Sequence, residues 1–154
     1  MSSDVRETVL RYLAEHPVMT LATVGPDGPW AAAVFYASEG FHLYFLSSPR
    51  SRHACDLAAD PHVAATIQEQ DADWRTIRGV QLAGTVSPLE GADRQRAMDV
   101  YLRKFPQFGD MARLPIELAA ALGRIEWYRL AATRVCFVDN TRGFGHRDEV
   151  PLSS

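Results

Sequence analysis

Short segments with alternating apolar residues, separated by turn signals, restrict this chain to a largely antiparallel β fold. The clearest pair flanks the turn sequence Gly-Pro-Asp-Gly at residues 25–28, which predicts a hairpin. The predicted strands cover residues 18–24, 29–38, 41–46, 62–68, 76–88, 124–130 and 133–139. Because long strands in quick succession leave few edges unpaired when the sheet curls, the pattern favours a barrel over an open sheet.

Helices are predicted between and around these strands. They cover residues 4–16, 49–60, 91–105 and 115–122. In the first, Asp4 and Glu7 resemble a capping box. In the second, Ser48 is the expected N-cap, because a proline follows it at the first helical position. We therefore expect a mainly β protein with peripheral helices.

The composition indicates a soluble globular protein of 154 residues, predicted as a single domain over residues 1–154 with a C-terminal tail at 140–154. Its net charge of −3 gives no reason to expect nucleic acid or a membrane as partner. There is no signal-peptide core or membrane-spanning run, so we expect a cytoplasmic protein. Cys55 and Cys136, which form no Cys-x-x-Cys motif, are expected to be reduced core residues.

The start of the second predicted helix carries an unusual set of bases. A helix N-terminus normally attracts acids, yet no acid precedes Asp56 here. The polar residues that gather at this point are Ser47, Ser48, Arg50, Ser51, Arg52 and His53. With the free backbone N–H groups they are suited to hold a phosphate. The alternative is a solvated basic patch that binds nothing.

The returning strand of the hairpin contains three consecutive alanines at residues 31–33, which are poor strand formers. Small side chains allow a planar ring to lie across the strand, and close packing of a helix or a second subunit is the alternative. Gly79 and Gly84 in the fifth predicted strand indicate a bulge or a bend.

The sequence gives little support for a metal site or for a known catalytic motif. The five histidines have no spacing typical of metal ligands, and we expect no metal site. No nucleophile elbow, zinc-protease, P-loop or dinucleotide motif is present, and no catalytic residue is assigned. If the chain is an enzyme, a bound cofactor supplies its reactivity.

Three segments together resemble the pyridoxamine 5'-phosphate oxidase-like FMN-binding split barrels, over roughly residues 18–150. They are LSSPRSRH at 46–53 followed by DPHV at 60–63, then IRGVQLAG at 77–84, and finally 127–130 with 135–140 and 143–147. The likeness is greatest to small bacterial members. It implies an antiparallel split β-barrel of the Greek-key type, which binds FMN.

The resemblance also implies a set of cofactor-binding residues. They are Ala32, Ala33, Val34, Phe35, Leu46, Ser47, Ser48, Arg50, Ser51, Arg52, His53, Gln81, Asn140 and Arg147. Ser51 and Arg52 match phosphate contacts, and His53 stands where lysine is common, although histidine is only partly charged near neutral pH. Residues 32–35 match the strand along the isoalloxazine ring.

Two residues of the tail match positions that reach the flavin from the partner subunit. Asn140 and Arg147 fall near the C-terminal tryptophan and arginine of the larger oxidases, but this chain lacks that tryptophan. Pyridoxamine phosphate is therefore not the expected substrate.

The family resemblance leads to one main hypothesis and two alternatives. The main one is a homodimeric FMN-dependent oxidoreductase, with FMN between the subunits and an unidentified small-molecule substrate or electron donor. The second is a non-catalytic carrier of flavin or haem. The third is a reductase that uses the deazaflavin F420.

Overall fold

The computed structural model describes residues 2–109 and 115–153. The strands are β1 (Val18–Gly25), β2 (Gly28–Phe35), β3 (Ala37–Glu39), β4 (His42–Ser47), β5 (His62–Gln68), β6 (Arg78–Pro88), β7 (Glu126–Asp139) and β8 (Arg147–Glu149). The helices are α1 (Ser2–Glu15), α2 (Arg52–Ala59), α3 (Gly91–Lys104) and α4 (Ile116–Gly123), with 3-10 turns η1 (Pro106–Gly109) and η3 (Asn140–Arg142).

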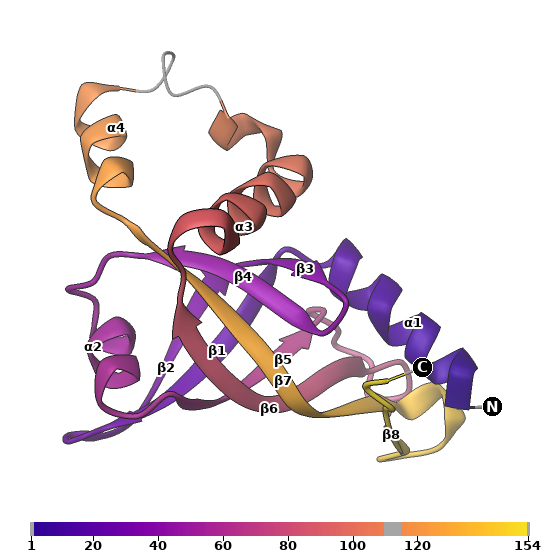
Figure 1. The fold of residues 1–154 in the computed structure, drawn as a ribbon. Coiled ribbons are helices and arrows are strands. Elements are labelled where there is room, and N and C mark those ends of the chain that lie inside the picture. The colour runs from indigo at the N-terminus through magenta and orange to yellow at the C-terminus, as the bar shows by residue number, and fades with distance from the viewer. Residues whose placement is uncertain (1, 110–114, 154) are drawn as a thin grey trace.

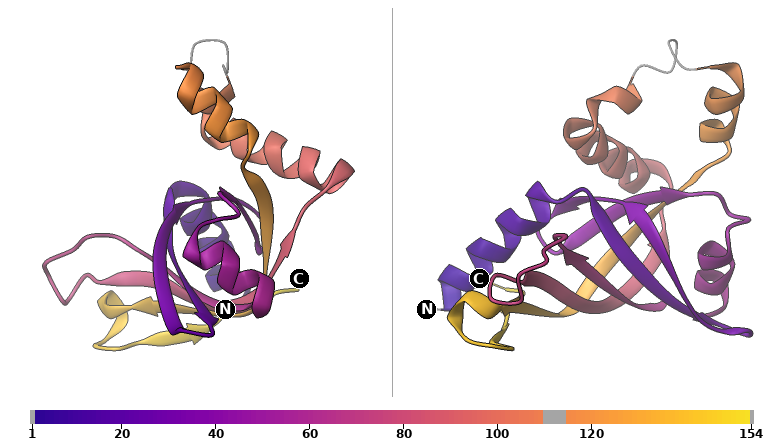
Figure 2. Two further views of the ribbon diagram at one scale, coloured as in Figure 1. Left: turned by 90° about the vertical axis from the view of Figure 1, so that its left-hand side faces the viewer. Right: turned by 180° about the vertical axis from the view of Figure 1, so that it is seen from behind.

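The strands form one curled antiparallel sheet in the order β2-β1-β5-β6-β7-β4-β3, with β8 paired to β7 (Figure 1). Among the described residues the two end strands, β2 and β3, do not pair with each other, so the barrel is split at this point. Helix α1 lies against one end of the curled sheet, α2 at the other, and α3 and α4 stand above β4 (Figures 1 and 2). The predicted split barrel is confirmed.

The β1–β2 hairpin forms as predicted, with Gly25 paired to Gly28. The two strands predicted over 124–130 and 133–139, however, are one continuous strand, β7. The separation was wrong because the two alanines between these segments carry no turn signal, and they pair with β6. The expected irregularity is present, since the β6–β7 register shifts at Gly84.

Three other boundaries differ from the prediction. Strand β2 stops at Phe35, because the buried Tyr36 turns away and donates its hydroxyl to the carbonyl of Leu13 at 2.7 Å. The tail predicted as irregular contains β8, although residue 154 lies outside the described residues. Helix α1 begins at Ser2, so Asp4 lies in its first turn rather than at its N-cap.

The N-cap predicted for α2 was also wrong. Ser51 is the N-cap, and its hydroxyl accepts from the backbone N–H of Ala54. Ser48 closes a turn instead, because its carbonyl accepts from the N–H of Ser51 at 3.1 Å. Arg50 therefore lies in the turn before the helix, and Arg52 and His53 are its first two residues. The helix ends at Asp60, as predicted.

Two apolar cores hold the molecule together. The larger fills the curled sheet and includes the stripe Val9, Tyr12 and Leu13 of α1. The smaller lies under α3, where Tyr101 packs edge-on against Trp127 with ring centres 5.2 Å apart. These clusters account for α1 and α3 covering the sheet.

The two cysteines are not core residues, contrary to the prediction. Cys55 is exposed and Cys136 is half-buried, and both are free thiols. Cys55 follows Ala54, which faces the core, so the helix turns it away from the buried face. No helix in the described part of the chain is long and apolar enough to cross a membrane.

Candidate functional site

Helix α2 is fixed to the sheet by a buried polar pair. The hydroxyl of Thr23 on β1 donates to the carboxylate of Asp56 at 2.9 Å, and both side chains are buried. Gly25 makes room for this carboxylate, because a Cβ at that position would lie 1.9 Å from an Asp56 oxygen. The pair determines where the start of α2 stands relative to the β1–β2 hairpin.

Three of the predicted residues meet at the start of α2. The Ser47 hydroxyl lies 2.6 Å from Nε2 of His53 and 3.1 Å from the Ser51 hydroxyl. Ser51 also lies 3.3 Å from the same imidazole nitrogen, and its own hydroxyl donates to the carbonyl of Ser48. We call Ser47, Ser51 and His53 the α2 cluster. The first N–H groups of a helix have no partner within it, so this cluster adjoins free backbone donors.

Burial determines the charge of the α2 cluster. Desolvation lowers the pKa of His53 below its ordinary value, and the negative charge of Asp56 opposes this shift only in part. The His53 imidazole is therefore mainly neutral near pH 7. It contributes less positive charge than a lysine would at this position.

The arginines near the cluster point in different directions. The guanidinium of Arg52 lies over the Trp30 ring of β2, with its central carbon 4.2 Å from the ring centre. It also reaches the carbonyl of Asp27 in the hairpin turn at 3.5 Å. Arg50 lines a separate hollow with Ser48 and Arg124. The structure thus brings the side chains of Ser47, Ser51 and His53 together, whereas Ser48 meets this group only through its backbone carbonyl and the Arg50 side chain lines the separate hollow.

The predicted ring-binding strand, residues 32–35 of β2, lies at one end of the sheet, and β1 is its only partner among the described strands. Its side chains are half-buried or exposed, and Phe35 is 51% exposed. Leu46 is half-buried beside Trp127, in an apolar hollow above β4. An edge strand with small residues leaves its backbone open to a ligand or to a second chain.

Small side chains cover the open face of the sheet. Residues paired across antiparallel strands point to the same side. One row across β2, β1, β5 and β6 therefore consists of Ala31, Ala22, Ala64 and Ala83. The next row consists of Ala33, Thr20, Thr66 and Gln81. Gln81 is exposed on this face.

The predicted tail residues lie at the opposite end of the sheet from α2 within one chain (Figures 1 and 2). The side chain of Asn140 joins two loops: its amide donates to the carbonyl of Trp74 at 2.7 Å, and its oxygen accepts from Gly145 at 3.0 Å. Arg147 is exposed on β8. Neither residue reaches the α2 cluster of its own chain.

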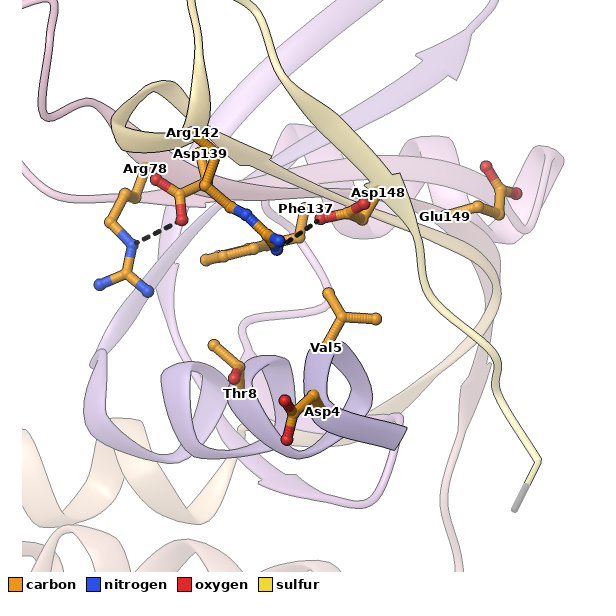
Figure 3. Close-up of a pocket in the computed structure, with 9 residues that line it drawn as sticks. All are labelled: Asp4, Val5, Thr8, Arg78, Phe137, Asp139, Arg142, Asp148 and Glu149. Atoms are coloured by element: carbon orange, nitrogen blue, oxygen red, sulfur yellow. Dashed lines mark ion pairs between the residues drawn. The ribbon is translucent and has the colours of Figure 1, made fainter. Parts of the chain in front are cut away.

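A hollow of about 420 Å³ lies between α1 and the β7–β8 end (Figure 3). Both of its arginines are already paired with carboxylates of the lining, Arg78 with Asp139 at 3.7 Å and Arg142 with Asp148 at 3.8 Å. It contains none of the predicted cofactor residues. The start of α2 therefore remains the stronger candidate site.

Comparison with known proteins identifies the family. The family model described as pyridoxamine 5'-phosphate oxidase matches residues 5–139. The chain belongs to the pyridoxamine 5'-phosphate oxidase family. UPF0306 protein YhbP of Salmonella arizonae is 32% identical over 146 residues, which cover 94% of this chain and 91% of that protein. The protein of the same name from Salmonella schwarzengrund matches to the same extent.

Solved structures show the fold of the family in more distant proteins. A haem-binding protein from Mycobacterium smegmatis is 23% identical, with 99% of this chain and 58% of that one covered and a TM-score of 0.73. Campylobacter jejuni ChuZ is 18% identical, with 96% and 59% covered and a TM-score of 0.77. HutZ, the haem storage protein from Vibrio cholerae, is 19% identical, with 84% and 91% covered and a TM-score of 0.65.

Sequence reasoning missed several residues of the site. Thr23 and Asp56 lie 33 positions apart, and nothing local pairs them. Trp30 was not linked to Arg52, because stacking across two elements leaves no spacing pattern. Asp56 could have been found from the sequence, because it is an acidic residue next to Leu57, on the face of α2 that packs against the core.

Proposed function

We propose that this chain binds FMN with its phosphate at the start of α2. The observation that carries the proposal is the α2 cluster, in which two hydroxyls and an imidazole converge beside free helix N–H groups. Ser47 and His53 fit a phosphate, because a hydroxyl and an imidazole can each donate a hydrogen bond, whereas the Ser51 hydroxyl already donates to the Ser48 carbonyl. Membership of the family supports FMN as the source of that phosphate.

Arg52 supplies the full positive charge near this cluster. Its guanidinium rests on the Trp30 ring, and the residue is exposed, so it is accessible to an anion. A charge-assisted hydrogen bond from arginine to phosphate is among the stronger polar contacts in proteins. We infer that Arg52 and the α2 cluster bind the phosphate, with the small residues 32–33 of β2 beside the flavin ring.

The proposed activity is an oxidoreduction of an unidentified small molecule. When bound, FMN supplies the hydride chemistry, and the protein binds and orients the reactants. The chain's own residues anchor the phosphate and leave β2 accessible. No described residue is assigned as an acid or base, because none beside the α2 cluster combines accessibility with a suitable geometry.

We further propose a homodimer that packs through the small-residue face. Two sheets meet closely when their side chains are small, and the alanine row of β2, β1, β5 and β6 is such a surface. In such a dimer the partner subunit brings its tail to the cofactor, since the tail of each chain, with β8, lies at the opposite end of the sheet from α2. Sedimentation should show a dimer, and Ala64→Arg should yield monomers; a wild-type monomer would contradict the proposal.

Titration with FMN, followed by quenching of flavin fluorescence, tests the cofactor. Arg52→Ala should weaken FMN binding by about 10- to 150-fold, which corresponds to about 1.5–3 kcal/mol for a lost hydrogen bond to a charged group. Arg75→Ala is the matched control, because Arg75 is also exposed but pairs with Asp73 on another loop. Unchanged affinity of the Arg52 variant would remove this residue from the site. A parallel titration with F420 distinguishes the deazaflavin alternative.

One observation favours haem as the second candidate ligand. His62 is exposed, and its Nδ1 lies 2.8 Å from the Asp60 carboxylate, which leaves Nε2 directed away from that partner. Metal-binding histidines are typically oriented by such a carboxylate. Added haemin should then shift its Soret band on binding, and His62→Ala should abolish the shift while His42→Ala retains it. No Soret shift with the wild-type protein would exclude haem, and an unchanged shift with the His62 variant would exclude His62 as its ligand.

A further inference from the structure

Two neighbouring hollows lie above β4, beside the α2 cluster but outside it. The first is lined by Ser48, Pro49, Arg50, Arg124 and Ile125 and has a volume of about 540 Å³. The second lies between α3 and the start of β7 and measures about 320 Å³. Ile125 lines both, so the two hollows adjoin each other. Their volumes are in the range of small-molecule sites.

The second hollow is mainly apolar. Its lining includes Leu46, Met98, Leu102, Phe108 and Trp127, on four different elements. Trp127 is buried, and the other four side chains are half-buried. The hollow therefore suits an alkyl or aryl group, whose transfer from water is favourable at such a surface.

The charges on these hollows all have one sign. Arg50 and Arg124 line the first hollow and Arg94 lines the second, and no described lining residue of either is acidic. No ion pair between described residues includes any of these three arginines. An anionic group on a ligand would therefore find guanidinium partners without competing carboxylates.

We propose that the two hollows bind one small organic acid, with its carboxylate at Arg50 and Arg124 and its apolar body beside Leu46, Met98 and Phe108. Charge complementarity selects the acid over a neutral or basic molecule of the same shape. The apolar lining selects it over a small hydrophilic anion. This site does not depend on FMN, because the α2 cluster that carries the cofactor proposal lies outside both hollows.

Isothermal titration of the unmodified protein tests the proposal with three probes that share one body: 4-phenylbutyrate, its neutral amide and 4-phenylbutylamine. We expect the acid to bind at least tenfold more tightly than the amide, and the amine to bind more weakly than the amide. Arg124→Gln should weaken binding of the acid at least tenfold and leave the amide unchanged. Arg75→Gln, an exposed arginine on a distant loop, is the control.

Several results would overturn the proposal. They are no binding of the acid, equal affinity for the acid and the amide, or an Arg124 variant that binds the acid like the wild type. Saturation with FMN provides a further check, because the acid should still bind. Displacement of the acid by FMN would assign these hollows to the cofactor instead. Failure of FMN to bind at all would refute the cofactor proposal alone.

Discussion

Replacement of Thr23 by valine tests whether the buried polar pair holds α2 in place. Valine has the shape of threonine but cannot donate to the Asp56 carboxylate, which accepts from Thr23 at 2.9 Å in a buried setting. A hydrogen bond to a charged group contributes about 1.5–3 kcal/mol, and its loss leaves the acceptor without that partner. We expect the free energy of unfolding to fall by about 2 kcal/mol.

Thermal denaturation followed by circular dichroism measures this change. For a chain of this size, about 2 kcal/mol corresponds to a fall in Tm of roughly 4–8 °C. Thr20→Val is the matched control: Thr20 is half-buried on the same strand, and its side chain makes no hydrogen bond to a described residue. A Thr23 variant within about 0.5 kcal/mol of the wild type would refute the proposed role, since that is the usual effect of a surface substitution.

Three further predictions concern the α2 cluster, the register shift at Gly84 and the half-buried Lys104. His53→Lys should leave FMN affinity unchanged or raise it, most clearly above pH 7, because lysine stays charged there; weaker binding would contradict the assignment. Gly84→Ala should lower the free energy of unfolding, measured by urea denaturation, by about 2–3 kcal/mol, because its Cβ would lie 2.4 Å from the Ala131 carbonyl oxygen. Gly109→Ala is the control: the nearest atom to its Cβ would lie 3.9 Å away, so the free energy of unfolding should change little. Burial lowers the pKa of Lys104 to about 8, so the unfolded chain binds this proton more tightly than the folded one does. The free energy of unfolding should therefore rise between pH 8 and 9.5, by about 1 kcal/mol after allowance for solvent screening. The variant Lys104→Met should lack this rise.

The sequence predicted most of the strands because each of them is specified locally. Alternating apolar residues and the glycine turn at 25–28 suffice for the hairpin, and Pro61 suffices for the end of α2. The division of β7 failed because two alanines favour neither a turn nor a strand, so pairing with β6 and β4 determined the outcome. The prediction of the N-cap of α2 failed because three serines lie close together in the sequence. The turn in which the Ser48 carbonyl accepts from the N–H of Ser51 makes Ser51 the N-cap, and this turn has no separate sequence signal.

The candidate site was less predictable, since its contacts connect distant parts of the chain. The charge pattern indicated the start of α2, where Ser47, Ser51 and His53 do meet. It did not indicate that Arg50 and Arg52 separate, since Arg50 lines a hollow of its own and Arg52 lies over the Trp30 ring. Nor did it indicate that the amide of Asn140 is occupied in joining two loops. Such contacts depend on the tertiary packing and have no local signal.

The central claim, that the start of α2 holds the phosphate of FMN, is tested most directly by comparing FMN with riboflavin. The two molecules differ only in the phosphate, so the difference in their affinities measures its contribution. We predict that the wild-type protein binds FMN at least tenfold more tightly than riboflavin, and that Arg52→Ala removes most of this difference. Equal affinity for FMN and riboflavin would contradict the account.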